Sequence, residues 1–321
     1  FMPSIIIASD KSNSGKTMVR SVVSSYLKSK GISVSAIPAL HDLSPSDKES
    51  PELSGVEVVS GFDAIDANAT SDKDIGKISD VISKNSSGKM LISESNSTDM
   101  GYNRKLAEAS NSKILLVADS IDRAEKIKSE LGESLAGIIY NNIARHRMDS
   151  IRSGDDDRVL SIIPENRYMV SSTVDQYAKH LKGKYIYESD KKNELVLNVL
   201  IGGIVLDWSV LYYESQKNVL ALIRGDRPDL QLGALQAGGN GKGIVLTKGI
   251  EPIEYVTYEA KKLQIPLIMV EYNTHEAADK ISGIVAKSKF DHADKLESCL
   301  SHFTGNLSQR AVDKAMDLNT L

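Results

Sequence analysis

One short loop near the start of the chain limits the possible folds most strongly. Residues 12–17 read Ser-Asn-Ser-Gly-Lys-Thr and lie between an apolar run at 4–8 and an amphipathic stretch at 17–30. The isoleucine-rich run is typical of a buried strand, whereas the stretch has helical spacing and ends at Lys30-Gly31. The sequence therefore predicts a strand–loop–helix unit whose helix begins directly at the loop.

The residue types in this loop suit a phosphate group. Gly15 lets the backbone come close to an anion, and the first amides of the following helix point toward it. Lys16 supplies a positive charge for the β and γ phosphates, and the Thr17 hydroxyl is a suitable ligand for Mg²⁺. We therefore predict a triphosphate site. The alternative is a Ser/Gly turn with an exposed lysine.

Short apolar runs and amphipathic stretches go on alternating to about residue 166. Strands are predicted at 32–37, 89–92, 114–118, 136–140 and 159–163, and a helix at 121–131. This alternation indicates an α/β fold of the P-loop NTPase type, with a mostly parallel sheet and helices on both faces. Residues 44–88 are rich in Ser, Asp and Asn, so we expect an irregular, partly helical surface segment there.

A second series of elements follows a polar stretch at 168–193. Its predicted strands are 195–200, 219–223, 243–247 and 266–270, and its predicted helices are 229–236, 252–263, 275–287 and 306–316. A length of 321 residues at about 150 per domain favours two domains. We predict a first domain at 1–170, a linker at 171–193 and a smaller α/β domain at 194–321.

Composition excludes several classes of protein. The 39 Lys and Arg against 43 Asp and Glu give a net charge of −4, which argues against a nucleic-acid partner. The single cysteine, Cys299, excludes an internal disulfide and a multi-cysteine zinc site. No apolar run reaches the roughly 20 residues of a membrane span, and no leader precedes the first strand. We expect a cytoplasmic protein with no membrane or nucleic-acid partner.

The loop also departs from the usual P-loop, because Asp10 stands where a glycine begins that motif. In this form residues 6–17 resemble the loop of dethiobiotin synthetase and cobyrinic acid a,c-diamide synthase, whose class includes the chromosome-partitioning ATPases. Lys11 stands where the partitioning members carry a lysine that reaches a partner subunit's nucleotide. Ser12 and Asn13 replace the two glycines that follow that lysine.

The resemblance implies ATP and Mg²⁺ as cofactors, a homodimer, and a set of binding residues. Lys16 and Lys11 would be the catalytic pair. The nucleotide would be held by the loop and the first turn of the helix, namely Ser12, Asn13, Ser14, Gly15, Lys16, Thr17 and Met18.

A later strand end supports the resemblance at the metal. Residues 91–96, Leu-Ile-Ser-Glu-Ser-Asn, resemble the family's strand that ends in Val-Glu-Gly-Ala-Gly. The resemblance implies that Glu94 approaches a Mg²⁺ ion bound at Thr17, and the alternative is an exposed loop glutamate. A third metal ligand stays open between Asp42 and Asp47.

Two further segments follow in family order. Residues 137–142 resemble the strand end whose asparagine, here Asn141, reads adenine. Residues 160–165 resemble the Ile-Pro segment that comes next, which places Pro164 beside the nucleotide.

The residues that serve the synthetases' specific chemistry are missing. Dethiobiotin synthetase has Lys-Pro after its second strand, whereas Ile37-Pro38 offers no lysine. The cobyrinate synthases add a nucleophilic cysteine on a strand-to-helix turn, whereas Cys299 lies in a predicted helix around 296–300. We interpret Cys299 as a buried structural thiol.

The second domain resembles the DRTGG domain. Gly225-Asp226-Arg227 precedes a predicted helix that Asp226 would cap, and a later strand ends at Thr247 with Lys248 in place of the first motif glycine. One interpretation is a pocket in which Arg227 and Thr247 hold an anionic metabolite beside Asp226. The other is a capped helix with an Arg–Asp bridge that fixes the turn.

A dethiobiotin-synthetase-like domain followed by a DRTGG domain is the arrangement at the N-terminus of long phosphotransacetylases. The resemblance implies their regulatory portion, so our first hypothesis is a Mg-ATP-binding regulator. The alternative hypotheses are an ATP-dependent ligase that activates a carboxylate as an acyl phosphate, and a scaffold with a vestigial loop. Whether the chain is an enzyme stays open.

Overall fold

The computed structural model describes residues 4–38, 40, 52–59, 71–154, 156–203 and 206–317. The chain forms two compact units. The first unit comprises Phe1–Asn166 together with Phe290–Leu321, and the second unit comprises Arg167–Lys289. The expected positions of Asp42 and Asp47 lie outside the described residues.

The first unit is built on a parallel sheet in the order β3-β2-β4-β1-β5-β6-β7. Most of its strands are buried on both faces, which is why they appear in the sequence as continuous apolar runs. The strands are β1 (Ser4–Ala8), β2 (Val34–Ile37), β3 (Glu57–Val58), β4 (Met90–Glu94), β5 (Ser112–Ala118), β6 (Leu135–Ile143) and β7 (Val159–Pro164).

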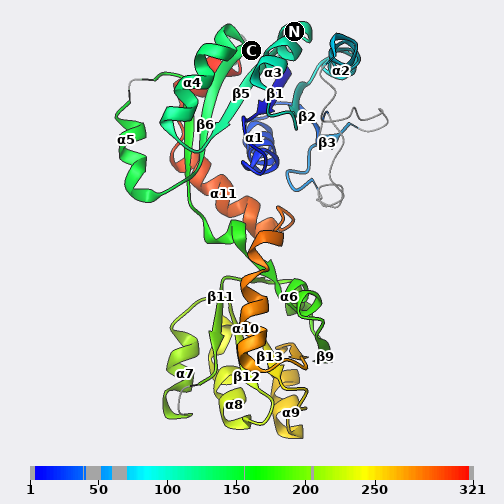
Figure 1. Cartoon of the computed structure of the whole chain (residues 1–321), viewed down its shortest axis with the longest axis vertical. Coiled ribbons are helices and arrows are strands. Elements are labelled where there is room, and N and C mark those ends of the chain that lie inside the picture. Colours follow the sequence, from blue (N-terminus) through cyan, green and yellow to red (C-terminus); the bar gives the residue numbers. More distant parts are fainter. Residues whose placement is uncertain are drawn as a thin grey trace. The chain divides into compact units, whose positions relative to one another are not determined.

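Helices cover both faces of this sheet, as Figure 1 shows. One core joins alternate strand residues such as Ile6, Leu91 and Leu116 to four helices: α2 (Asp72–Asn85), α3 (Met100–Ala109), α4 (Ile121–Leu131) and α5 (Met148–Arg152). The helices that pack elsewhere on this unit are α1 (Lys16–Ser29), α11 (Ala293–Gly305) and α12 (Gln309–Ala315). The predicted α/β class is confirmed.

The chain returns to the first unit at its C-terminal end. Phe303 of α11 is fully buried and meets the Tyr26 ring of α1 edge to face at 5.7 Å. The Ser161 hydroxyl of β7 donates to the Phe303 carbonyl at 2.8 Å, and the Ser308 amide donates to the Leu160 carbonyl at 2.8 Å. Residues 290–321 therefore belong to the first unit, in contrast to the predicted 194–321 domain.

The second unit has a five-stranded sheet in the order β11-β12-β13-β14-β9, in which only β9 is antiparallel. Its elements are β8 (Ser172–Thr173), α6 (Val174–His180), β9 (Lys184–Tyr187), β10 (Leu195–Val196), β11 (Asn198–Ile201), α7 (Leu206–Glu214), β12 (Val219–Arg224), α8 (Pro228–Gln236), β13 (Gly241–Thr247), α9 (Glu254–Leu263), β14 (Leu267–Met269) and α10 (Thr274–Ser282).

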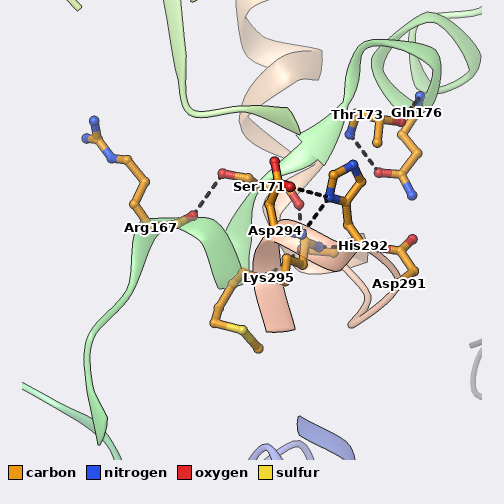
Figure 2. A network of polar contacts seen from close by, with 10 residues as sticks. Arg167, Ser171, Thr173, Gln176, Asp291, His292, Asp294 and Lys295 are labelled. Atoms are coloured by element: carbon orange, nitrogen blue, oxygen red, sulfur yellow. Dashed lines mark hydrogen bonds and ion pairs between the residues drawn. The ribbon is translucent and has the colours of Figure 1, made fainter. Parts of the chain in front are cut away.

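The predicted linker at 171–193 is a folded part of this second unit. Thr173 and Gln176 form a reciprocal capping box that starts α6, with backbone–side-chain distances of 2.8 and 3.2 Å (Figure 2). β9 then pairs with β14 at the edge of the sheet. Polar composition suggested a linker here, but the edge strand β9 and the short helix α6 also carry several charged and polar residues.

Short 3₁₀ turns connect several elements. They are Gly132–Ser134, Arg145–Arg147, Arg167–Val170, Asp190–Asn193, Gly238–Asn240 and Val285–Lys287. Of the predicted irregular segment at 44–88, the described part contains β3 and α2. Within the described ranges, no helix combines the length and the apolar character needed to cross a bilayer.

Candidate phosphate site

The predicted phosphate loop joins β1 to α1 at the carboxyl end of the central strand. Gly15 is the N-cap of α1 with a φ of 89°, and no side chain caps the helix. The first-turn amides are therefore available to an anion. The Lys16 side chain is buried, and its ammonium donates to the Lys11 carbonyl at 3.4 Å, so the lysine folds back over the loop.

The loop contains groups that a phosphate could engage. The Ser14 hydroxyl is buried and has no hydrogen-bond partner among the described residues. Lys11, Ser12 and Asn13 are exposed, and Asn13 takes a left-handed φ of 55°. A buried unpartnered hydroxyl next to an uncapped helix start fits a phosphate oxygen. Ser12 and Asn13 could add their backbone amides.

Asn141 reaches the loop from the end of β6. Its Nδ2 donates to the Ser14 carbonyl at 2.9 Å. A Cβ at position 15 would lie 2.3 Å from the same Nδ2, so a larger residue would push Asn141 aside, and the left-handed φ of 89° also favours glycine. The structure thus brings Asn141 to the loop, where its amide holds the backbone. Whether it also reads adenine stays a prediction.

Pro164 and Met18 complete the predicted nucleotide set. Pro164 ends β7 and pairs with Ile143 of β6, so it shares the carboxyl edge of the sheet with Asn141. The Met18 side chain is 1% exposed and packs in the core, so only its backbone is available to a nucleotide.

Thr17 and Glu94 meet as the metal prediction required. The Thr17 hydroxyl donates to Glu94 Oε1 at 3.0 Å, from the first turn of α1 to the end of β4. Both groups are hard oxygen donors, which Mg²⁺ prefers. The described ranges contain no cluster of three or more His, Cys, Asp or Glu residues suited to a metal ion.

Sequence reasoning missed two ion pairs that surround the loop. Lys11 pairs with Asp119, which follows β5, and this hydrogen bond lowers the pKa of the Asp119 carboxyl. Arg123 of α4 pairs with Asp10 at 2.6 Å. Asp10, which replaces the usual first glycine, thus anchors the loop to α4. No local pattern could reveal pairs more than 100 residues apart.

Sequence reasoning also missed a buried arginine near Glu94. Arg20, on the second turn of α1, is 3% exposed and places Nη2 3.0 Å from Glu52 Oε2. Its Nε lies 3.9 Å from Glu94 Oε2. The only sequence signal was the spacing of three residues between Thr17 and Arg20, which puts both on one helix face.

Cys299 has the character predicted for it. It is fully buried in α11, and burial raises the pKa of its thiol to about 12. The Asn166 amide donates to the sulfur at 3.8 Å. A neutral, inaccessible thiol is a structural group.

The predicted residues of the second unit lie together at the carboxyl ends of β12 and β13. Asp226 forms an ion pair with Arg224, and Arg227 pairs with Asp229 at 2.6 Å. Asp226 was predicted to cap α8, but the N-cap is Arg227 and Pro228 begins the helix, which leaves Asp226 one residue too early.

Thr247 is connected to this turn through the backbone. Its carbonyl accepts from the Gly225 amide at 3.2 Å, and its buried hydroxyl lies 3.2 Å from the Thr274 hydroxyl. A Cβ on Gly225 would lie 2.1 Å from the Ile250 carbonyl oxygen, which explains the glycine. These contacts match the interpretation in which Arg–Asp pairs fix the turn.

The first unit therefore has the fold and loop placement of a P-loop NTPase, and a second α/β unit is joined to it. Residues 176–284 match the DRTGG domain family. Over 221 residues the chain is 25% identical to phosphate acetyltransferase of Synechocystis sp., which covers 61% of this chain and 32% of the relative. The predicted resemblance to the DRTGG domain and to phosphotransacetylases is confirmed. The matched region spans about a third of that enzyme.

Solved structures give weaker likenesses. The MinC:MinD cell division protein complex of Aquifex aeolicus has 18% identity and a TM-score of 0.36, covering 52% of this chain and 83% of that chain. The CBS and DRTGG domains of the regulatory region of Clostridium perfringens pyrophosphatase, complexed with diadenosine tetraphosphate, have 16% identity and a TM-score of 0.32, covering 56% and 75%.

Proposed function

We propose that the first unit binds Mg-ATP at residues 12–18 and that the second unit is a regulatory module for a small anionic metabolite. The observation that carries this proposal is the meeting of the Thr17 hydroxyl and the Glu94 carboxylate at 3.0 Å beside the uncapped start of α1. A phosphate chain on the helix amides would bring its metal ion to this pair.

The residues of the loop have distinct tasks in this proposal. Lys16 would turn its ammonium from the Lys11 carbonyl to the β and γ phosphates. Ser14 would donate its buried hydroxyl to a phosphate oxygen. Thr17 and Glu94 would hold Mg²⁺, which supplies charge neutralisation on the phosphates. Asn141 and Pro164 would face the base at the edge of the sheet.

Lys11 has a conditional role. In the single chain it pairs with Asp119, and that pair is 48% and 36% exposed at its two side chains. An exposed pair of this kind contributes little to stability, so Lys11 can leave it for a nucleotide phosphate. In a homodimer Lys11 would reach the nucleotide of the other copy. We place this function in the cytoplasm, where ATP is abundant.

Calorimetric titration with Mg-ATP and a non-hydrolysable analogue tests the proposal. We expect micromolar binding by the wild type, loss of binding in Lys16→Ala, and no change in Lys105→Ala, which removes an exposed lysine of α3. No binding by the wild type would refute the proposal and favour a scaffold.

Parallel hydrolysis assays separate regulator from ligase. The regulator predicts turnover that is slow with ATP alone and is not raised by small carboxylates or amines. Brisk turnover that requires a small carboxylate would instead support the ligase that forms an acyl phosphate. Sedimentation with and without nucleotide measures whether binding changes the oligomeric state.

The metabolite site of the second unit needs its own test. Arg227 already pairs with Asp229, so an anion would have to compete with a neighbouring carboxylate. We expect Asp229→Asn to strengthen binding of a panel of small phosphates and carboxylates, and Arg227→Ala to abolish it. Equal weak binding by both variants would place the ligand elsewhere.

A further inference from the structure

Arg20 is a buried cation that the phosphate site does not explain. Its guanidinium is 3% exposed and lies between two carboxylates that are themselves buried, Glu52 and Glu94. Nη2 is 3.0 Å from Glu52 Oε2, whereas Nε is 3.9 Å from Glu94 Oε2. The contact with Glu52 is thus an ion pair at hydrogen-bond distance, and the contact with Glu94 is looser.

Glu52 is held firmly by its own surroundings. Its Oε1 accepts from the Ser21 hydroxyl at 3.3 Å and from the amide and hydroxyl of Ser54 at 3.1 and 2.5 Å. Three donors hold this carboxylate, and one of them, the Ser21 hydroxyl, belongs to α1. Glu52 therefore gives Arg20 a permanent partner.

The guanidinium retains unused hydrogen-bonding capacity. Arg20 Nε and Nη1 are buried and have no hydrogen-bond partner in the described part of the chain. A guanidinium has five N–H donors, and leaving buried donors unpaired is unfavourable. Glu52 and Glu94 therefore balance the charge of Arg20, but two of its nitrogens lack hydrogen bonds among the described residues. The guanidinium can gain hydrogen bonds if a neighbouring group moves.

Glu94 connects Arg20 to the metal position. Its Oε1 accepts from the Thr17 hydroxyl at 3.0 Å, while its Oε2 faces Arg20. A divalent ion at Thr17 and Glu94 would stand close to the guanidinium. Because like charges in a buried site repel strongly, the ion and the present position of Arg20 oppose each other.

We propose that Arg20 is a resident cation that holds Glu94 toward Glu52 in the metal-free protein and gives up Glu94 when a divalent ion binds. The inference rests on the proposed function, because it concerns the same metal position. Arg20 is a positioning residue in this scheme. Its withdrawal onto Glu52 would transmit metal loading to the segment around Ser54.

Titration with Mn²⁺ alone, followed by the loss of the free-ion electron paramagnetic resonance signal, tests this without nucleotide. In Arg20→Met two buried carboxylates lose their cation, so we expect Mn²⁺ to bind at least tenfold more tightly than in the wild type. Melting temperature gives a second readout, since Mn²⁺ should stabilise Arg20→Met more than the wild type. Arg20→Lys should restore weak Mn²⁺ binding.

Glu52→Gln changes the affinity in the opposite direction. Among the described residues Arg20 then has Glu94 as its only carboxylate, so Mn²⁺ should bind more weakly than in the wild type. The double variant Arg20→Met/Glu52→Gln, which carries no net change of charge, covers the case in which Arg20→Met alone does not fold, and it should still bind Mn²⁺ more tightly than Glu52→Gln. Arg104→Met, an exposed arginine of α3, is the matched control.

Two results would overturn the inference, because a merely structural arginine predicts either of them. One is a Mn²⁺ affinity of Arg20→Met equal to that of the wild type. The other is Mn²⁺ binding that is weakened equally in Arg20→Met and Glu52→Gln. The proposed function fails by a different result, namely the absence of Lys16-dependent Mg-ATP binding in the wild type. The two failures are therefore distinguishable.

Discussion

Truncation of Phe303 to alanine tests whether the C-terminal segment completes the first unit. Phe303 is fully buried, with 0% of its surface exposed to solvent. Its ring meets the Tyr26 ring edge to face, with an interplanar angle of 69°. Removing a buried phenylalanine side chain costs about 3–5 kcal/mol, from lost burial and the cavity that remains. About 0.5–1.5 kcal/mol of this belongs to the aromatic pair.

The assay is urea unfolding followed by two signals. The single tryptophan, Trp208, lies in α7 and reports the second unit, while loss of Mg-ATP binding reports the first. We expect Phe303→Ala to lower the unfolding free energy of the first unit by about 3–5 kcal/mol. The tryptophan transition should stay unchanged.

Controls sharpen the result. Ser301→Ala changes an exposed position of the same helix and should alter stability by less than about 0.5 kcal/mol. A double-mutant cycle of Phe303→Leu with Tyr26→Leu should give a coupling of about 0.5–1.5 kcal/mol. A shift of the tryptophan transition alone would refute the assignment of α11 to the first unit.

Three further predictions concern single groups. Gly15→Ala forces an alanine into a φ of 89° and against Asn141 Nδ2, so thermal melts should show a loss of about 1–2 kcal/mol, and calorimetry should show no Mg-ATP binding. Adding Asn141→Ala should relieve the contact and recover part of the stability but not the binding. The Cys299 thiol has its pKa raised to about 12 by burial, whereas it titrates near 8.5 when unfolded. Its contribution to stability is therefore complete below about pH 8.5 and is lost as the pH rises toward 12, so the difference in urea midpoint between wild type and Cys299→Ala should narrow from pH 8 to pH 10. The pKa of Asp119 is lowered by the hydrogen bond from Lys11, so this interaction is present above the unfolded value near 3.9 and is lost as the pH falls through the lower folded value. In Lys11→Met, carbon-detected carboxyl titration should show the Asp119 pKa moving upward, and an unmoved value would contradict the pairing.

Local patterns predicted most of the elements because short buried strands carry a strong signal. The apolar run at 4–8 matches strand β1, and the run at 114–118 lies within strand β5. Helix α4 begins and ends at the predicted residues 121 and 131. The return of α11 to the first unit could not be predicted in this way. Its helical pattern is visible, but periodicity does not say which sheet a helix covers.

The candidate site was predictable where its residues follow one another in a single loop. Gly15, Lys16 and Thr17 are consecutive, and Glu94 followed from a strand end, so their meeting required only a parallel sheet. Arg20 and Glu52 could not be found because an arginine in a helix and a glutamate in a polar segment are ordinary in a sequence. Only burial of both side chains distinguishes them.

The two crossings of the chain between the units set an order for biosynthesis. The phosphate loop is made before α11 and α12. These two helices pack against α1, β6 and β7, yet they emerge only after the whole second unit. Until then the apolar side chains around Tyr26 and Leu160 lack their cover and present a surface that favours chaperone binding. The second unit is contiguous and can fold during translation, so the first unit is completed after it, although the loop at 12–17 is made before it.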